Sequence, residues 1–311
     1  QIGTASALTQ LQALDTGGVY DYNHVYTGSG AITAADSDAV TAGASDKPKH
    51  MMDTPDSAAA VQVGLIDGGL DTRHIVFRNA TVHRWGCDNK PAPSAHGTAV
   101  ASLMVGKAGH FRGVVPGASL YAADVYCNTN TGGAVDNIVG ALAWFAKERI
   151  AVVNISLVGP PNQMLERGVR AMLSHGHMLV AAVGNDGPAA PPLYPASYPG
   201  VIGVSAVDVQ GRVLPEAARG SQVMFAAPGN GIVAAAIGDP PYRVVRGTSF
   251  ASPLVAAMLA TYISQPNPVA ARLALAQLAR QAVPPDADRI TKEVGYGVLG
   301  EAFVVKPEQM R

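Results

Sequence analysis

The stretch RGTSFASPLVAAMLATYI, Arg246 to Ile263, joins a small polar opening to a long apolar run. Local rules predict a buried helix with Ser252 as its N-cap and Pro253 as its first residue, because serine caps free N–H groups and proline needs no donor there. On this interpretation Ser249 is a polar turn residue with no specific role. The alternative is a nucleophile at the positive end of a helix, and the rest of the chain must decide between them.

The composition excludes several classes of protein. The chain has 311 residues, of which 48% are hydrophobic and 14% charged, and its net charge is −1. This length suffices for a large core in one α/β unit. The near-neutral charge and the lack of a basic stripe predict no nucleic-acid partner. No apolar run reaches the ~18 residues of a membrane span, so we expect no membrane span.

Short apolar segments alternate with helix-like segments from Val61 onward. The strand-like segments are rich in β-branched residues and bounded by Gly, Pro or Asn; they are 61–67, 119–126, 151–158, 177–185, 200–208 and 221–229. The helix-like segments are 96–106, 137–149, 164–176, 246–263 and 267–283. This alternation predicts an α/β fold, a doubly wound, mostly parallel sheet with helices on both faces.

Residues 1–60 have a different texture. Residues 27–60 are mostly small and polar and lack a hydrophobic period, which is typical of a linker or an extended loop. The sequence therefore predicts a single domain over 61–311 with an N-terminal extension over 1–60.

Four chemically useful residues fall at the ends of predicted elements. Asp67 and Asn185 end strand-like segments, while His96 and Ser249 open helix-like ones. Taken singly, each fits a turn, a cap or a core position better than a catalytic role. Together they supply the nucleophile, base, carboxylate and oxyanion donor of an acyl-transfer site.

The motifs around these residues carry a family resemblance. GLIDGGLD (64–71), HGTAVAS (96–102), AAVGNDG (181–187) and GTSFASP (247–253) resemble the four signatures of subtilisin-like serine proteases. The order Asp, His, Ser and the separations of 29 and 153 residues suit that family. The resemblance extends from about Val61 to about Phe303.

The resemblance implies a role for each residue. Ser249 would attack the scissile carbonyl, His96 would accept its proton, and Asp67 would orient the imidazole. Asn185 and the backbone N–H of Ser249 would form the oxyanion hole. This chemistry needs neither a metal nor a cofactor, and none is expected.

The resemblance also implies a peptide-binding groove. Ser156, Leu157 and Val158 would pair with an extended protein or peptide substrate, and Gly132 and Gly133 would form the opposite edge.

Two positions of that groove depart from the family pattern. Val158 and Leu193 stand where relatives carry glycine, so we expect a shallow P1 pocket for small or medium apolar residues. Asp186 on the rim favours the alternative of a basic P1.

Three further expectations follow from the resemblance. Val76 and the segment 105–113 lack the ligands of the family's tight calcium site, so we expect no strong calcium there. Cys87 and Cys127 would lie on one side of the cleft, as a disulfide in an oxidising compartment or as two free thiols. The histidines other than His96 are expected at the surface.

The extension and the function each leave alternatives open. Residues 1–25 are either the tail of a propeptide, which would make the chain's own propeptide a partner, or an arm of the mature enzyme. The leading hypothesis is a secreted or periplasmic serine endopeptidase. The alternatives are a non-catalytic peptide-binding module and a peptide ligase that uses the same triad.

Overall fold

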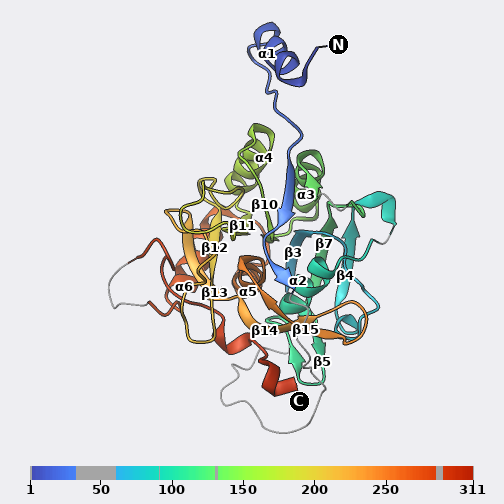
Figure 1. Ribbon diagram of the computed structural model, residues 1–311, viewed down its shortest axis with the longest axis vertical. Coiled ribbons are helices and arrows are strands. Elements are labelled where there is room, and N and C mark those ends of the chain that lie inside the picture. Colours follow the sequence, from blue (N-terminus) through green and yellow to red (C-terminus); the bar gives the residue numbers. More distant parts are fainter. Residues whose placement is uncertain (1, 33–60, 91, 130–131, 285–289, 311) are drawn as a thin grey trace.

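The computed structural model describes residues 2–32, 61–90, 92–129, 132–284 and 290–310. Its centre is a seven-stranded parallel sheet in the order β13-β12-β11-β9-β3-β7-β4 (Figure 1). The strands are β3 (Gln62–Asp67), β4 (Thr81–Trp85), β7 (Ser119–Asp124), β9 (Val152–Ile155), β11 (Met178–Ala182), β12 (Ile202–Val207) and β13 (Val223–Pro228). The predicted α/β sheet is confirmed. The edge strand β4 was not predicted, because its sequence TVHRW is half polar and no residue in it is fully buried.

Helices cover both faces of this sheet. On one face α5 (Thr248–Ala260) packs against α2 (Ala95–Val105) and crosses β9, β11, β12 and β13, and α6 (Pro268–Ala279) packs on α5. On the other face α3 (Val135–Glu148) packs beside α4 (Gln163–Ser174). The short helices are η2 (Ile75–Phe77), η3 (Cys87–Asn89), η4 (Glu301–Phe303) and η5 (Pro307–Met310). Among the described residues, no helix is both long and apolar enough to cross a membrane.

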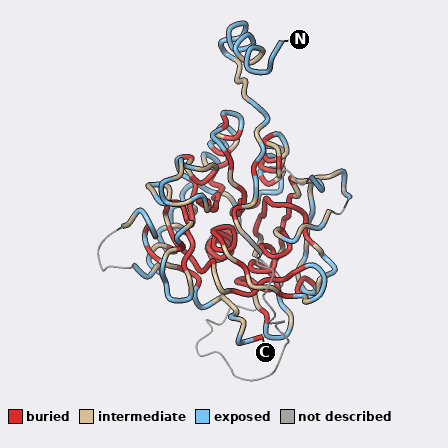
Figure 2. The backbone as a smooth tube through the Cα atoms, in the orientation of Figure 1, coloured by how far each residue is buried: buried red, intermediate tan, exposed pale blue. Residues whose placement is uncertain are grey.

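The pleat of the sheet divides the core into two layers. Along β3, Val63 and Leu65 belong to the core on the α2 and α5 side, whereas Ile66 belongs to the core on the α3 and α4 side. Successive side chains of a strand point to opposite faces, so a sheet buried on both sides needs a continuous apolar run. Figure 2 shows the buried chain concentrated in this central body.

The N-terminal extension enters the body as strands. Helix α1 (Thr4–Leu14) lies outside the body and contains no buried residue (Figures 1 and 2). The chain then forms β1 (Val25–Gly28), the middle strand of a three-stranded antiparallel sheet between β10 (Leu157–Val158) and β8 (Gly133–Ala134). Next, β2 (Ala31–Ile32) pairs with the hairpin of β14 (Asn230–Ala235) and β15 (Tyr242–Arg246). The rest of the expected linker, residues 33–60, lies outside the described residues.

The predicted start of α5 is wrong. The helix begins at Thr248 with Gly247 as its N-cap, so Pro253 lies inside it and Ser252 is not the cap. Proline lacks the N–H that would bond the carbonyl four residues earlier, which belongs to Ser249. That carbonyl instead accepts a hydrogen bond of 3.0 Å from the Ser156 hydroxyl. A tertiary contact therefore replaces the missing helical bond, and Ser249 moves from a turn into the first turn of the helix.

Candidate active site

Asp67 and His96 meet at the carboxyl end of the sheet. Asp67 is the last residue of β3 and is fully buried, and Nδ1 of His96 lies 2.9 Å from both of its carboxylate oxygens. His96 is in the first turn of α2, whose N-cap Ser94 accepts a hydrogen bond from the Gly97 N–H at 2.9 Å. The cap fixes the start of the helix and with it the ring of His96.

Gly68 has no room for a side chain. A Cβ built on Gly68 would lie 2.6 Å from Oγ and 2.9 Å from Cβ of Ser94. The Gly68 N–H still donates to Oδ1 of Asp67 at 2.7 Å. The carboxylate therefore keeps a hydrogen bond from this residue.

The surroundings of His96 act on its pKa in opposite directions. Burial disfavours the charged imidazolium, but the charge of Asp67 and its hydrogen bond outweigh burial, so the pKa of His96 is raised above 6.5. An imidazole with this pKa is a stronger base than a free one. The site can thus accept a proton at His96 and hold the resulting charge beside Asp67.

Ser249 lies opposite this pair in the first turn of α5. Its hydroxyl donates to the Ser156 carbonyl at 3.1 Å and lies 2.8 Å from the hydroxyl of Ser29. Nε2 of His96 is buried and finds no hydrogen-bond partner within the described ranges. Proton transfer to His96 would therefore require the Ser249 hydroxyl to turn from Ser156 toward Nε2.

The carbonyl oxygen of Ser29 receives two converging hydrogen bonds. It accepts from the Ser249 N–H at 3.1 Å and from Nδ2 of Asn185 at 2.5 Å. Asn185 is oriented for this because its Oδ1 accepts the Thr248 N–H at 3.1 Å. The Ser249 N–H is one of the free donors of the first helical turn, at the positive end of the helix dipole. Both donors are those expected from the sequence, but Ser29 as the acceptor was not foreseen.

Strand β1 fills the groove that the sequence assigned to substrate. Thr27 and Gly28 are in register with Val158 and Leu157, and Tyr26 is in register with Gly133. The structure therefore brings three of the five expected edge residues into register with one extended segment. The segment belongs to the chain itself.

The other two edge residues act differently. Gly132 has a φ of +113°, and a Cβ there would overlap the Tyr26 carbonyl, so glycine is required where the backbones approach. Ser156 is fully buried and faces α5, where it bonds the backbone and side chain of Ser249. Ser156 therefore holds Ser249 in place through these two hydrogen bonds. It is not one of the residues in register with the bound segment.

The groove beyond Ser29 is lined by residues that the sequence analysis named for the P1 pocket. Val158, Leu193 and the exposed Asp186 line it together with Asn185. Leu193 packs over Gly184, because a Cβ on that glycine would lie 2.5 Å from Cδ1 of Leu193.

Among the described histidines, His177 does not lie where it was expected, and His50 lies outside the described residues. His177 is 5% exposed, not at the surface, and its Nδ1 lies 2.7 Å from the Ile150 carbonyl. Burial lowers its pKa, which favours the neutral ring. Its burial could have been inferred, because His177 opens the strand-like segment 177–185 and directly precedes the buried strand β11.

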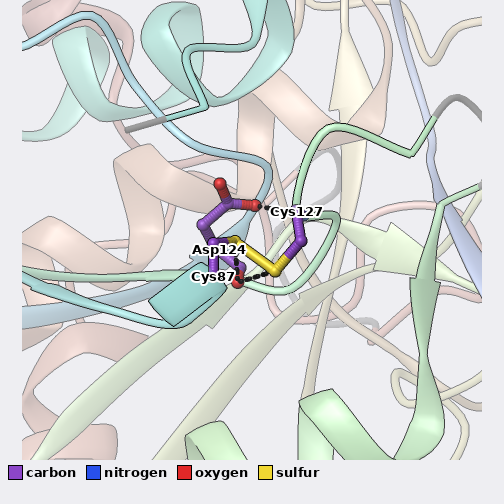
Figure 3. Close-up of side chains that lie close together, drawn as sticks. All are labelled: Cys87, Asp124 and Cys127. Atoms are coloured by element: carbon purple, nitrogen blue, oxygen red, sulfur yellow. Dashed lines mark hydrogen bonds between the residues drawn. A yellow bond between two sulfur atoms is a disulfide. The ribbon is translucent and has the colours of Figure 1, made fainter. Parts of the chain in front are cut away.

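Cys87 and Cys127 form a disulfide with a Cα–Cα distance of 5.0 Å (Figure 3). Oδ1 of Asp124 accepts the Cys127 N–H at 3.0 Å beside it. The three side chains are close enough to suggest a metal site, but bonded sulfurs are not thiolate ligands. The bridge closes a loop that contains His96 and ties it to the end of β7.

Removing this disulfide should destabilise the fold. The cysteines are 40 residues apart, and a chain-entropy estimate for that loop is about 4 kcal/mol. We expect the variant with both Cys87→Ser and Cys127→Ser to lose roughly 2–4 kcal/mol in urea unfolding, measured in a Ser249→Ala background to prevent autolysis. Dithiothreitol should destabilise the parent and not the double variant. Equal stability of the two would contradict a native bridge.

The segment 105–113, which lacks the ligands of the family's tight calcium site, contains a small hairpin. The strands β5 (Lys107–Ala108) and β6 (Phe111–Arg112) pair there, and Val76 is fully buried. The absence of strong calcium binding at this place stays a prediction. EDTA should leave the melting temperature unchanged, and a fall of several degrees that added calcium reverses would contradict it.

Comparison with known proteins shows which family this geometry belongs to. The Subtilase family model matches residues 58–297, and the chain belongs to that family. It is 33% identical to Subtilisin E of Bacillus subtilis (strain 168) over 218 residues, covering 66% of this chain and 56% of that protein. It is 31% identical to Minor extracellular protease Epr of the same organism over 213 residues, covering 66% of this chain and 32% of that protein. The chain thus spans about a third to about half of the length of these curated relatives.

Solved structures agree on the fold. The structure of the self-cleaved protease domain of PatA matches with a TM-score of 0.66 and 25% identity, covering 79% of this chain and 96% of that one. Homologues in the subtilisin family are serine endopeptidases.

Proposed function

We propose that the protein is a serine endopeptidase that acts through Asp67, His96 and Ser249. The observation that supports it most is the Ser29 carbonyl, which accepts from the Ser249 N–H and from Asn185 at the end of a segment bound as an extended strand. A substrate carbonyl in that position has its oxygen where negative charge develops during attack.

The proposed mechanism assigns one task to each group. The Ser249 hydroxyl attacks the carbonyl carbon while Nε2 of His96 takes its proton and later gives it to the leaving amine. Asp67 stabilises the imidazolium, and the two N–H donors stabilise the oxyanion. Water then hydrolyses the acyl-enzyme by the same route in reverse.

The substrate preference at P1 is proposed from the groove walls. Val158 and Leu193 line the space beside the small residue Ser29, which we assign to the P1 position. We expect a peptide series varied at P1 to be cleaved roughly 10-fold faster after Ala than after Phe. Faster cleavage after Phe would overturn the shallow pocket, and Lys as the best residue would assign Asp186 to substrate binding.

The extension is proposed to act as a propeptide bound in cis. Its contacts reach the N-termini of two helices, since Asp21 accepts the Gln163 N–H at 2.8 Å and Asn23 accepts the Asp136 N–H at 3.2 Å. These bonds use free donors of α4 and α3. The disulfide fits the proposed secreted or periplasmic location.

Labelling of the purified chain by a fluorophosphonate probe, together with casein hydrolysis, tests the endopeptidase. Absence of both, with peptide binding retained, would favour the non-catalytic module. Accumulation of ligated products over hydrolysed ones when an amine is added would favour the ligase.

A further inference from the structure

The bound segment places one peptide bond of this chain at the catalytic serine. The residue whose carbonyl lies between the two oxyanion donors is Ser29, so the bond in the scissile position is Ser29–Gly30. The chain continues on the far side, because β2 pairs with β15 directly after Gly30. The segment is therefore held on both sides of this bond, as an uncut substrate is.

The residue after the bond has no room for a side chain. A Cβ on Gly30 would lie 2.6 Å from Cε2 of Phe250 and 3.3 Å from the Arg246 carbonyl oxygen. Phe250 is fully buried, and its ring packs against His96 with centroids 5.3 Å apart. The ring cannot move aside without disturbing the core or the catalytic histidine.

The residues before the bond are also selected by contacts. A Cβ on Gly28 would lie 3.1 Å from Nε2 of His96, which is tighter than an ordinary contact. Tyr26 is fully buried, and its hydroxyl donates to the Pro160 carbonyl. A Cβ on Gly159 would lie 2.7 Å from the Tyr26 ring, so this glycine opens the space for the ring.

The propeptide role proposed above makes Ser29–Gly30 the bond that the enzyme would cut in itself. We propose that Phe250 restricts the position after the cut to glycine, both in this bond and in other substrates. The inference rests on the endopeptidase proposed above. Ser249 Oγ bonds to the carbonyl carbon of Ser29, the C–N bond to Gly30 breaks, and the Gly30 amine takes the proton from His96. Water releases Ser29 as a carboxylate and restores Ser249. The recognised sequence reads Tyr-Thr-Gly-Ser before the cut and Gly after it.

The first arm of the test uses the full chain and follows its intact mass and N-terminal sequence. We expect a new N-terminus at Gly30 in the wild-type chain. Gly30→Val should slow this cut by roughly 100-fold, because a displaced scissile bond costs about that much. Gly17→Val is the matched control, since that glycine is exposed and a Cβ there meets only Oδ1 of Asp15 at 3.6 Å. It should be cut at the wild-type rate.

The second arm uses peptides and processed enzyme. Peptides with the sequence VYTGSGAI and VYTGSVAI should differ by roughly 100-fold in kcat/KM, with glycine preferred. Phe250→Ala or Phe250→Leu should narrow this ratio to about 10-fold or less. If neither variant folds, the ratio of kcat/KM for the two peptides, measured with the wild-type enzyme, still tests the preference for glycine after the cut.

The outcomes separate the two proposals. Casein hydrolysis by a chain whose Ser29–Gly30 bond stays intact would overturn the self-cleavage and leave the endopeptidase standing. Equal rates for the two peptides would overturn the role of Phe250. No labelling by a fluorophosphonate and no hydrolysis of any substrate would overturn the endopeptidase itself.

Discussion

Replacement of Ser249 by alanine is expected to lower the rate of peptide hydrolysis by about 10⁶-fold, the scale on which a serine nucleophile contributes. The variant keeps the oxyanion donors, because the backbone N–H of residue 249 and the side chain of Asn185 are unchanged. It loses only hydroxyl contacts to Ser156 and Ser29. We therefore expect a folded, full-length protein that no longer reacts with a fluorophosphonate.

The measurement needs a control for the loss of a buried serine hydroxyl. Ser205 in β12 is fully buried, and its Oγ finds no hydrogen-bond partner in the described part of the chain. Ser205→Ala should therefore keep wild-type activity and the same melting temperature. Residual activity of Ser249→Ala within about 100-fold of wild type would contradict the nucleophile.

Replacement of Asp67 by asparagine is expected to lower the rate by about 10⁴-fold and to move its pH dependence. His96 acts as a base only when neutral, so the wild-type rate falls as the pH drops through the pKa of His96, which lies above 6.5. Asparagine removes the charge that raises this pKa, while burial, which lowers it, remains. The acid limb of the residual activity should therefore move to lower pH.

A profile of kcat/KM against pH, measured on the free peptide VYTGSGAI, checks both parts of this prediction. The matched control is Asp71→Asn, because the side chain of Asp71 accepts hydrogen bonds from the Arg73 side chain and backbone N–H, both at 3.1 Å. This variant should keep the wild-type acid limb. An unchanged limb in Asp67→Asn would mean that another group sets the pKa of His96.

The sheet and the convergence of four site residues could be predicted because both depend on local patterns. Buried parallel strands are apolar runs in the sequence, and the residues that end these strands meet at one edge of the sheet. Asp67 and Asn185 stood at such ends, and His96 and Ser249 opened helix-like segments. Gly132, Gly133 and Leu157 followed from the resemblance, since they belong to segments beside those ends.

The occupant of the groove could not be predicted in the same way. Strand β1 reads VYTG, a short piece of a polar segment, and only Tyr26 in it is fully buried. Its partners lie more than a hundred residues away in sequence, so no local period reveals the pairing.

The prediction of where α5 begins was wrong for a related reason. The hydrogen bond from Ser156 that compensates for Pro253 is a tertiary contact, which local rules do not include. The state of the two cysteines depends on a distance that spacing does not encode.

The position of β1 in the middle of its sheet has a consequence for how activity would depend on dilution. While Ser29–Gly30 is intact, the segment and the groove are parts of one molecule, and the effective concentration of the segment does not change with volume. After the cut, residues 1–29 are a separate peptide whose return to the groove is bimolecular. Inhibition by the attached segment before the cut is then independent of protein concentration. Inhibition by the released peptide after the cut weakens as the protein is diluted.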